Sequence, residues 1–294
     1  MKNENATEHY KGVKKVLIWV LLLNWLVALA KIAYGLLTNC SSMAADGFHS
    51  LSDGASNIIG LIGIHFACQP EDQDHPYGHK KYETLFSLAI AGMLFILAFN
   101  LAKQGIIRLS RPSTPQIDIG SFIIMLVTLG INIFVMHNER KKGLHLKSDI
   151  LISDALHTTA DIFTSLSVII ALIVIKLGYP ILDPIVTIII SLFIALAGWK
   201  IVKESSAVLC DTAAILDVKK ITDIVLAIEG VKNCHKIRSR GRPDDIHVDL
   251  HVQVEGTMHI NTSHKICYAI ENAIKKSIPE VTDVVVHIEP RESN

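Results

Sequence analysis

Apolar residues gather in long runs over the first two thirds of the chain. Val16–Leu37 is such a run, interrupted only by Asn24 and Lys31. Because about 20 predominantly apolar residues cross the hydrocarbon core of a bilayer as a helix, the run predicts a membrane-spanning helix. Similar runs predict further spans at about Leu85–Leu101, Ile119–Met136 and Ile181–Val202.

Two more segments, about Met43–Ala67 and about Asp149–Ile175, join a long apolar run to a stretch that holds carboxylates and a histidine. Charged groups are costly at membrane depth, so both segments can also be read as amphipathic surface helices. Their apolar continuations, and the short loops that six spans leave, favour transmembrane helices. The pattern therefore predicts six spans.

Basic residues around the spans predict their orientation. Cytoplasmic loops of membrane proteins are the ones rich in Lys and Arg. With both termini inside, the inner ends carry Lys2, Lys11, Lys14, Lys15, Lys80, Lys81, Arg140, Lys141, Lys142, Lys147, Lys200 and Lys203, and the outer ends carry Lys103, Arg108, Arg111 and Lys176. We expect a multi-pass protein of the cell membrane with cytoplasmic termini, whose first span is retained because no cleavage pattern follows it.

After about Glu204 the long runs give way to short elements. Helical and alternating patterns predict the order helix, strand, strand, helix, strand, with a turn at Ser239–Asp244 between the first two strands. The predicted elements are Val218–Glu229, Val231–Arg238, Ile246–Glu255, Thr262–Ser277 and Asp283–Glu289. We predict a transmembrane domain over residues 1–204 and a small α+β cytoplasmic domain over residues 205–294, with helices packed on one sheet face.

Composition agrees with a membrane protein and excludes other classes. Half of the 294 residues are hydrophobic and 19% are charged, below the roughly 25% of an average soluble domain. The 28 basic and 28 acidic residues balance, which argues against a nucleic-acid binder, and five scattered Cys argue against a disulfide-stapled module. Fourteen His in a chain poor in other polar residues direct attention to metal chemistry.

The two polar spans share the pattern D-x-x-H-x-x-x-D. One copy is Asp46, His49 and Asp53, and the other, 108 residues later, is Asp154, His157 and Asp161. Residues i and i+4 lie on one helix face, so each span presents an imidazole and a carboxylate on a common side. Together, His49, Asp53, His157 and Asp161 offer two nitrogens and two oxygens, a donor set that suits tetrahedral Zn²⁺.

Burying these groups in a membrane is costly, at least about 2.5–3.5 kcal/mol for one carboxylate at the bilayer centre. We therefore expect the four ligands to serve a function; a buried polar network that joins helices is the alternative. Asp46 and Asp154, one turn away, are read as carboxylates that orient the His rings, as helix caps or as water-facing groups. Protons compete with metal for such ligands, so a proton gradient can drive metal out.

Two further groups of ligand types lie outside the spans. Asp72, His75 and His79 fall within eight residues of a loop and suit a surface metal site, unless the histidines are incidental in a hydrophilic loop. On the predicted sheet, His251 shares one face of its strand with two other polar residues, and His287 shares a face with Glu289. These groups suit a second metal site, and a solvated sheet face is the alternative.

These features together resemble the cation diffusion facilitators, a family of metal/proton antiporters. The resemblance covers nearly the whole chain. It rests on the paired H-x-x-x-D motifs, on the loop Gln-Pro…Asp-His-Pro-Tyr-Gly-His-Lys-Lys-Tyr-Glu, on Asp183-Pro184 at the start of the sixth span and on the helix–strand order of the tail. It implies six transmembrane helices, a ferredoxin-like, metallochaperone-like cytoplasmic domain with the order αββαβ, and a homodimer.

The resemblance also implies site residues. The transport site is then His49, Asp53, His157 and Asp161, and a loop site is Asp72, His75 and His79. A binuclear cytoplasmic site at the dimer interface is His235, His251 and His287 with Glu289 where an Asp is usual, and with His264 as a peripheral ligand. The Glu is one methylene longer than Asp, so its ligand geometry differs from the family pattern.

The expected function is export of Zn²⁺ from the cytoplasm in exchange for H⁺, with Zn²⁺ as transported substrate and as structural or regulatory ligand of the cytoplasmic domain. The expected partners are divalent metal ions, protons, the lipid bilayer and a second copy of the chain, without nucleic acid. Export of Fe²⁺, Mn²⁺, Co²⁺ or Cd²⁺ and a non-transporting membrane metal sensor are alternatives. An intramembrane metalloenzyme is disfavoured because four inner ligands close the coordination shell and leave no open position.

Overall fold

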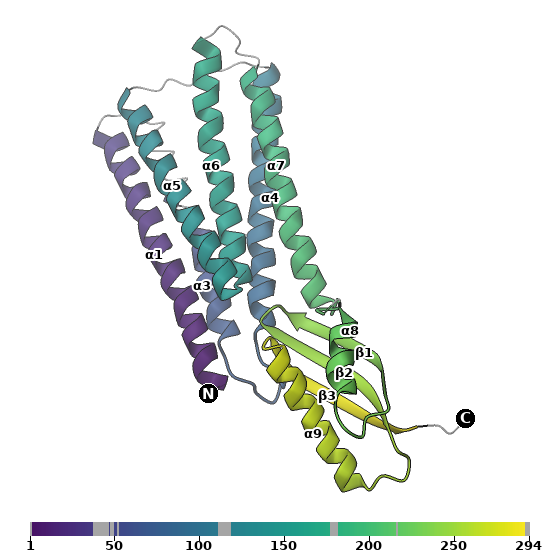
Figure 1. Cartoon of the computed structure of the whole chain (residues 1–294). Coiled ribbons are helices and arrows are strands. Elements are labelled where there is room, and N and C mark those ends of the chain that lie inside the picture. The colour runs from purple at the N-terminus through teal and green to yellow at the C-terminus, as the bar shows by residue number, and fades with distance from the viewer. Residues whose placement is uncertain are drawn as a thin grey trace. The chain divides into compact units, whose positions relative to one another are not determined.

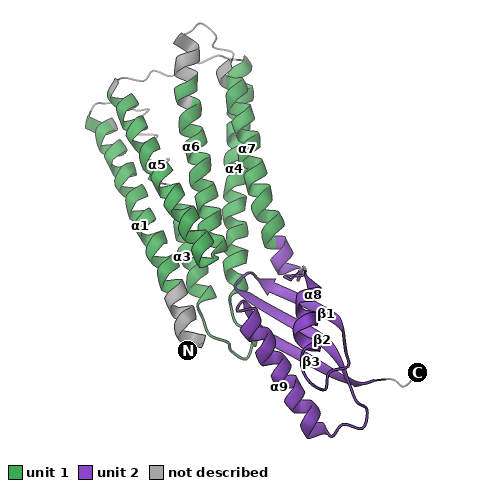
Figure 2. Ribbon diagram, viewed as in Figure 1, with its two compact units in different colours: residues 1–205 green, residues 206–294 purple. Residues whose placement is uncertain are grey.

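The chain divides into two compact units in a computed structural model, residues 1–205 and 206–294 (Figure 2). The structure describes residues 2–37, 47, 50–51, 53–110, 119–176, 182–215 and 217–291. His49 and Asp46 lie outside these residues.

The first unit is a set of long helices (Figure 1). Their bounds are α1 Lys2–Leu37, α3 Ala55–Ala67, α4 Lys81–Ser110, α5 Ile119–Leu146, α6 Asp149–Lys176 and α7 Leu182–Leu209, the last of which ends in the second unit. Helix α6 packs on α3, α4 and α5, and α1 packs on α3 and α5. Helix α6 is thus in contact with three other helices.

Four of the described helices are long and apolar enough to cross a membrane, over Tyr10–Tyr34, Lys81–Leu109, Phe122–Leu146 and Pro184–Leu209. They confirm a membrane helical unit and correspond to the first, third, fourth and sixth predicted spans. The helices extend beyond the apolar runs because the polar residues at their ends continue the backbone hydrogen bonding. Helix α6 covers the fifth predicted span; it is 28 residues long and carries three Asp. Helix α3 covers the second half of the second predicted span.

The second unit has the predicted order αββαβ: α8 Val218–Leu226, β1 Asn233–Arg242, β2 Asp245–Val254, α9 Ile260–Ser277 and β3 Val281–Pro290. Its sheet has the order β1-β2-β3, with β1 antiparallel and β3 parallel to β2. The α+β prediction is therefore confirmed for this unit.

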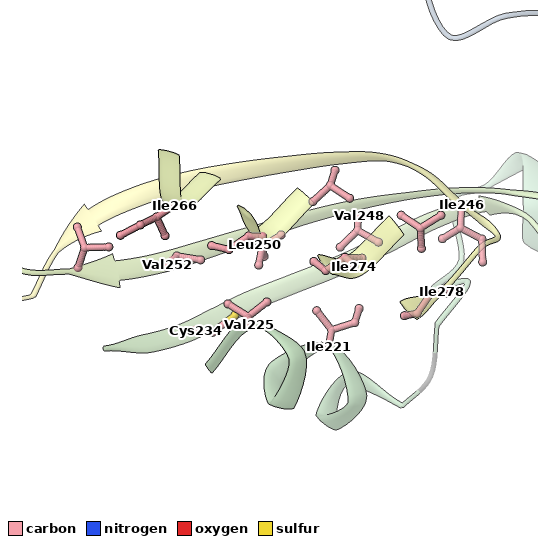
Figure 3. Packing of buried hydrophobic residues seen from close by; sticks show 14 residues of the cluster. Ile221, Val225, Cys234, Ile246, Val248, Leu250, Val252, Ile266, Ile274 and Ile278 are labelled. Atoms are coloured by element: carbon pink, nitrogen blue, oxygen red, sulfur yellow. The ribbon is translucent and has the colours of Figure 1, made fainter. Parts of the chain in front are cut away.

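The core of the second unit lies between the sheet and its helices. Alternate residues of β2, from Ile246 to Val254, are buried, and they pack with Ile221 and Val225 of α8 and with the buried side of α9 (Figure 3). Figure 3 shows these side chains interleaved on one side of the sheet. The other residues of β2 therefore lie on the opposite face, as the period-two alternation predicts.

The predicted turn at Ser239–Asp244 is wrong in its extent. Strand β1 continues through Arg242, which pairs with Asp245, so the hairpin loop is only Pro243 and Asp244. Gly241 marks the strand end because its φ of +113° favours glycine, and a Cβ there would lie 2.1 Å from the carbonyl oxygen of Asp245. The turn residues Gly241 and Pro243 do mark the hairpin, but the sequence pattern did not show that Gly241 and Arg242 still pair with β2.

Candidate metal sites

The first cluster lies in the membrane unit. One ligand atom from each of Asp53, His157 and Asp161 lies within 4.8 Å of the others. Asp53 comes just before α3, and the other two lie one turn apart on α6, so the contact between the two helices brings the halves of the repeated motif together. The structure unites three of the four predicted ligands, and the fourth, His49, lies outside the described residues.

The His157 ring is positioned to accept a ligand. Its side chain is 5% exposed, and neither ring nitrogen has a hydrogen-bond partner among the described residues. A buried polar group without a partner costs free energy, so such groups in native proteins need an explanation. A metal ion shared with Asp53 and Asp161 would satisfy one of these nitrogens.

Asp154 belongs to a buried polar chain that crosses the helices of this unit. Asn57 Nδ2 donates to Asp154 Oδ2, and Asn24 Nδ2 donates to Asn57 Oδ1 at 3.1 Å. Thr158 Oγ1 donates to Glu139 Oε2 at 3.0 Å. Asp154 is 1% exposed, so it is not a water-facing group, and it lies inside α6 rather than at its end, so it is not a helix cap. It links α6 to α3 through Asn57, and it makes no hydrogen bond to the ring of His157.

The sequence patterns predicted no role for Asn24, Asn57 or Glu139. Asn24 and Asn57 interrupt apolar runs, and a polar residue inside an apolar span is itself a sign of function or of a helix contact. Glu139 gave no such sign, because it stands in the polar run His137–Lys142 beyond the apolar part of α5, yet its side chain is fully buried. The partners of all three depend on helix packing.

Glu83 fixes the start of α6. Its carboxylate accepts from Ser148 Oγ and from Ile150 N, the latter at 3.4 Å, and Ser148 Oγ in turn accepts from Leu151 N at 3.4 Å. A second hydrogen bond joins the same two helices, since Thr84 Oγ1 of α4 donates to Asp149 Oδ2 of α6 at 2.7 Å. A carboxylate is favourable at a helix N-terminus because it meets unpaired N–H groups and the positive end of the helix dipole. Helix α4 thus positions the helix that carries His157 and Asp161.

The second cluster is the loop group Asp72, His75 and His79. Asp72 Oδ1 lies 3.1 Å from His75 Nδ1, and Asp72 Oδ2 lies 3.3 Å from His79 Nε2. Ligand atoms on a tetrahedral zinc ion lie roughly 3.4 Å apart, so these separations are close to those of a metal site. The pKa of Asp72 is lowered, chiefly because its carboxylate accepts the backbone N–H of His75.

A hydrogen bond to the backbone of Pro70 orients the ring of His79. Its Nδ1 lies 3.0 Å from the carbonyl oxygen of Pro70, so Nδ1 carries the proton and Nε2 offers its lone pair toward Asp72. The side chain is 4% exposed, whereas Asp72 is half exposed. This is the arrangement by which proteins fix the tautomer of a metal-binding histidine.

Replacing His79 with Gln is expected to lower the number of zinc ions bound per protomer by one, because the loop would keep only two of its three ligand side chains. Equilibrium dialysis of the purified full chain with zinc would measure this number. His65→Gln is the matched control, since His65 is exposed on α3 away from the three clusters. An unchanged zinc count in His79→Gln would show that the loop histidines bind no metal.

The third cluster lies on the sheet face of the second unit opposite its core. His235, His251 and His287 are directly paired across β1, β2 and β3, so they form one line across the sheet. Glu289 reaches all three: its oxygens lie 2.6 Å from His251 Nδ1, 3.2 Å from His235 Nε2 and 3.7 Å from His287 Nε2. Contact with His251 is the main reason that the pKa of Glu289 is lowered.

The predicted ligands of this site do not all lie equally close to one another. His235, His251 and Glu289 each offer one ligand atom within 4.8 Å of the others, whereas His287 joins through its ring contact with His251, at 4.6 Å between centroids. His264 lies exposed on α9, edge-on to Tyr268, and is not brought to this group within the described protomer. The longer Glu side chain is what allows one carboxylate to face three strands.

Glu289→Gln is expected to weaken metal binding to the sheet cluster at least about a hundredfold, because the amide keeps the size of the side chain but loses the anionic ligand, and loss of a group that only supports a ligand already costs about 10–100-fold. Calorimetric titration of the full chain with zinc would resolve this as the loss of one class of site. Glu255→Gln is the control, since Glu255 is exposed just beyond the end of β2. Equal zinc affinity in the two variants would contradict the assignment.

Comparison with known proteins identifies the family of both units. Residues 17–210 match the family model of the cation efflux transmembrane domain, and residues 216–291 match that of the cation efflux protein, cytoplasmic domain. An uncharacterized transporter of Methanocaldococcus jannaschii is 31% identical over 283 residues, which cover 95% of this chain and 99% of the relative.

Two further relatives have more specific names. A manganese efflux system protein of Bacillus subtilis, MneS, is 27% identical over 89% of this chain and 90% of its own length. The cation-efflux pump FieF of Shewanella oneidensis is 25% identical over 93% of this chain and 89% of its own length. The matched models cover both units, and the chain belongs to the cation diffusion facilitator family of multi-pass membrane proteins that export divalent metal cations.

Proposed function

We propose that this chain exports Zn²⁺ from the cytoplasm across the cell membrane in exchange for H⁺, as a homodimer. The observation that carries the proposal is the cluster of Asp53, His157 and Asp161 within the membrane unit, which His49 would complete. Alternating access would open this site first to the cytoplasm and then to the outside. No enzymatic reaction is assigned, since the family is one of transporters.

The choice of zinc follows from the donor set. Two imidazoles and two carboxylates suit tetrahedral Zn²⁺, whereas Mn²⁺ favours more oxygen ligands. The manganese efflux relative makes Mn²⁺ the principal competing substrate. The presence of a histidine in the described cluster supports zinc over manganese, and Cd²⁺ would be accepted with it.

Coupling to protons follows from the same groups. Imidazole and carboxylate bind either a proton or a metal ion, so loading the site with one displaces the other. On the outer side, protonation of His157 and the carboxylates would release the metal, and the protonated site would then return inward. The loop and sheet clusters would bind metal on their own units, with the sheet cluster tightening the dimer.

Metal flux into proteoliposomes under a pH gradient tests the proposal. Zn²⁺, Cd²⁺, Mn²⁺ and Fe²⁺ are compared at equal concentration, with and without the gradient. Zinc uptake that requires the gradient, is accompanied by counterflow of protons and exceeds manganese uptake is the expected result. Gradient-driven uptake of manganese in preference to zinc would show that Mn²⁺ is the transported ion instead of Zn²⁺. Absence of any uptake by the folded dimer would reject transport.

A further inference from the structure

A buried lysine lies beside the cluster of the membrane unit. Lys31 is on α1 and is only 8% exposed. Its Nζ donates to Ser50 Oγ at 2.9 Å, and Ser50 lies three residues before Asp53. The backbones are close here as well, since a Cβ on Gly47 would lie 3.0 Å from Lys31 Cβ. Helix α1 therefore holds an ammonium group against the segment that supplies one of the metal ligands.

The ammonium also acts on the ligands from α6. The charges that act on the Asp161 carboxylate include Lys31, together with His157 and Asp53. A lysine inside an apolar span is rare and costly, and such residues pair with other charged groups. Here the charge of Lys31 acts on the Asp161 carboxylate of the proposed transport site. Lys31 is not one of the residues that offer metal-ligand chemistry, because its ammonium has no lone pair.

The charges of the site explain what this lysine can do. Asp53 and Asp161 offer anionic ligands to the empty site, and the buried carboxylate of Asp154 also acts on Asp161. A bound divalent ion and the Lys31 ammonium are both positive, and both are attracted to these carboxylates. Metal and ammonium therefore repel each other, and charge interactions are strong in a medium of low dielectric constant.

We propose that Lys31 is the built-in counter-cation of the transport site: its ammonium stabilises the two carboxylates when no metal is present and weakens metal binding enough for release. This inference rests on the proposed function. Lys31 is a positioning residue in this role, since it acts on the metal through Asp53 and Asp161 rather than by ligation. It sets the balance between loading and release, which fixes the turnover rate of a transporter.

Replacing Lys31 with Met tests the inference, because Met keeps the length and loses the charge. We expect zinc transport in proteoliposomes to show a KM at least about tenfold lower and a maximal rate at least about tenfold lower than those of the wild type, since metal binds more tightly and leaves more slowly. Lys31→Arg retains the charge and should restore both values toward the wild type. A merely structural role would lower the rate without lowering KM.

Lys15→Met provides the matched control, because Lys15 is an exposed lysine of the same helix. It removes one positive charge from α1 without touching the hydrogen bond of Lys31 to Ser50, so its KM should stay close to that of the wild type. A fall in KM in Lys15→Met as large as that in Lys31→Met would assign the effect to the total charge of the helix and overturn the inference. An unchanged or raised KM in folded Lys31→Met would overturn it as well. Should Lys31→Met not fold, Lys31→Gln removes the charge with a polar side chain and is read in the same way.

Zinc binding in detergent separates this inference from the proposed function. Calorimetric titration of the purified full chain should show tighter zinc binding in Lys31→Met, and the gain should disappear when Asp161→Asn is added. Tighter binding by a chain whose wild type moves no metal would reject transport and leave the counter-cation in place. Transport by the wild type together with unchanged zinc affinity in Lys31→Met would support transport and reject the counter-cation role of Lys31.

Discussion

Replacing Asp161 with Asn is expected to abolish metal transport while the protein remains folded and dimeric. The amide has the same shape but lacks the anionic oxygen, so the cluster keeps His157 and Asp53 and loses one of its two charged ligands. Groups that only support a ligand already change metal affinity about 10–100-fold, so loss of a ligand should reduce transport by at least about a hundredfold. Zinc flux in proteoliposomes under a pH gradient measures this directly.

Asp74→Asn is the matched control for charge, because Asp74 is an exposed carboxylate of the same unit. Its transport rate should equal that of the wild type. In size-exclusion chromatography and thermal unfolding, both variants should show the same oligomeric state and the same melting temperature as the wild type. If folded Asp161→Asn kept full transport, the metal would cross by another route, and the assignment of the membrane cluster would have to be withdrawn.

The cytoplasmic unit was largely predictable because its patterns are local. Alternation along β2 places His251 and Ile246 on opposite faces, and the structure confirms this. The order of helices and strands follows from the same patterns. What alternation does not give is register. The line of His235, His251 and His287 across three strands depends on which residues pair, and His235 faces His251 only because the register of β1 shifts between His235 and Arg238.

The membrane unit was predictable in part. The repeated motif gave Asp53, His157 and Asp161 as candidates because each helix turn brings residues i and i+4 to one side. It could not show that Asn57 reaches Asp154 or that the charge of Lys31 acts on Asp161, since both depend on the packing of helices that are far apart in sequence. Polar residues in apolar spans indicate that a partner exists, but only packing identifies it.

Replacing Glu83 with Ala is expected to destabilise the membrane unit. The Glu83 side chain is fully buried, and its carboxylate accepts from Ser148 Oγ and Ile150 N at the first turn of α6. Glu83→Ala leaves these buried donors without their acceptor. Loss of hydrogen bonds to a charged group should lower the free energy of unfolding of the membrane unit by about 2–3 kcal/mol. Thermal unfolding in detergent would show the loss.

Transport should fall further than stability in this variant, because α6 carries both His157 and Asp161 and a displaced first turn changes where they lie relative to Asp53. We expect zinc flux to fall at least about tenfold even at temperatures where Glu83→Ala is folded, since small displacements of metal ligands are costly. Glu83→Gln keeps a side-chain oxygen that can accept from Ser148 and should recover most of the stability and flux. If Glu83→Ala transported zinc at the wild-type rate, the position of α6 would not depend on this contact, and the helix would be held by its packing on α3, α4 and α5 alone.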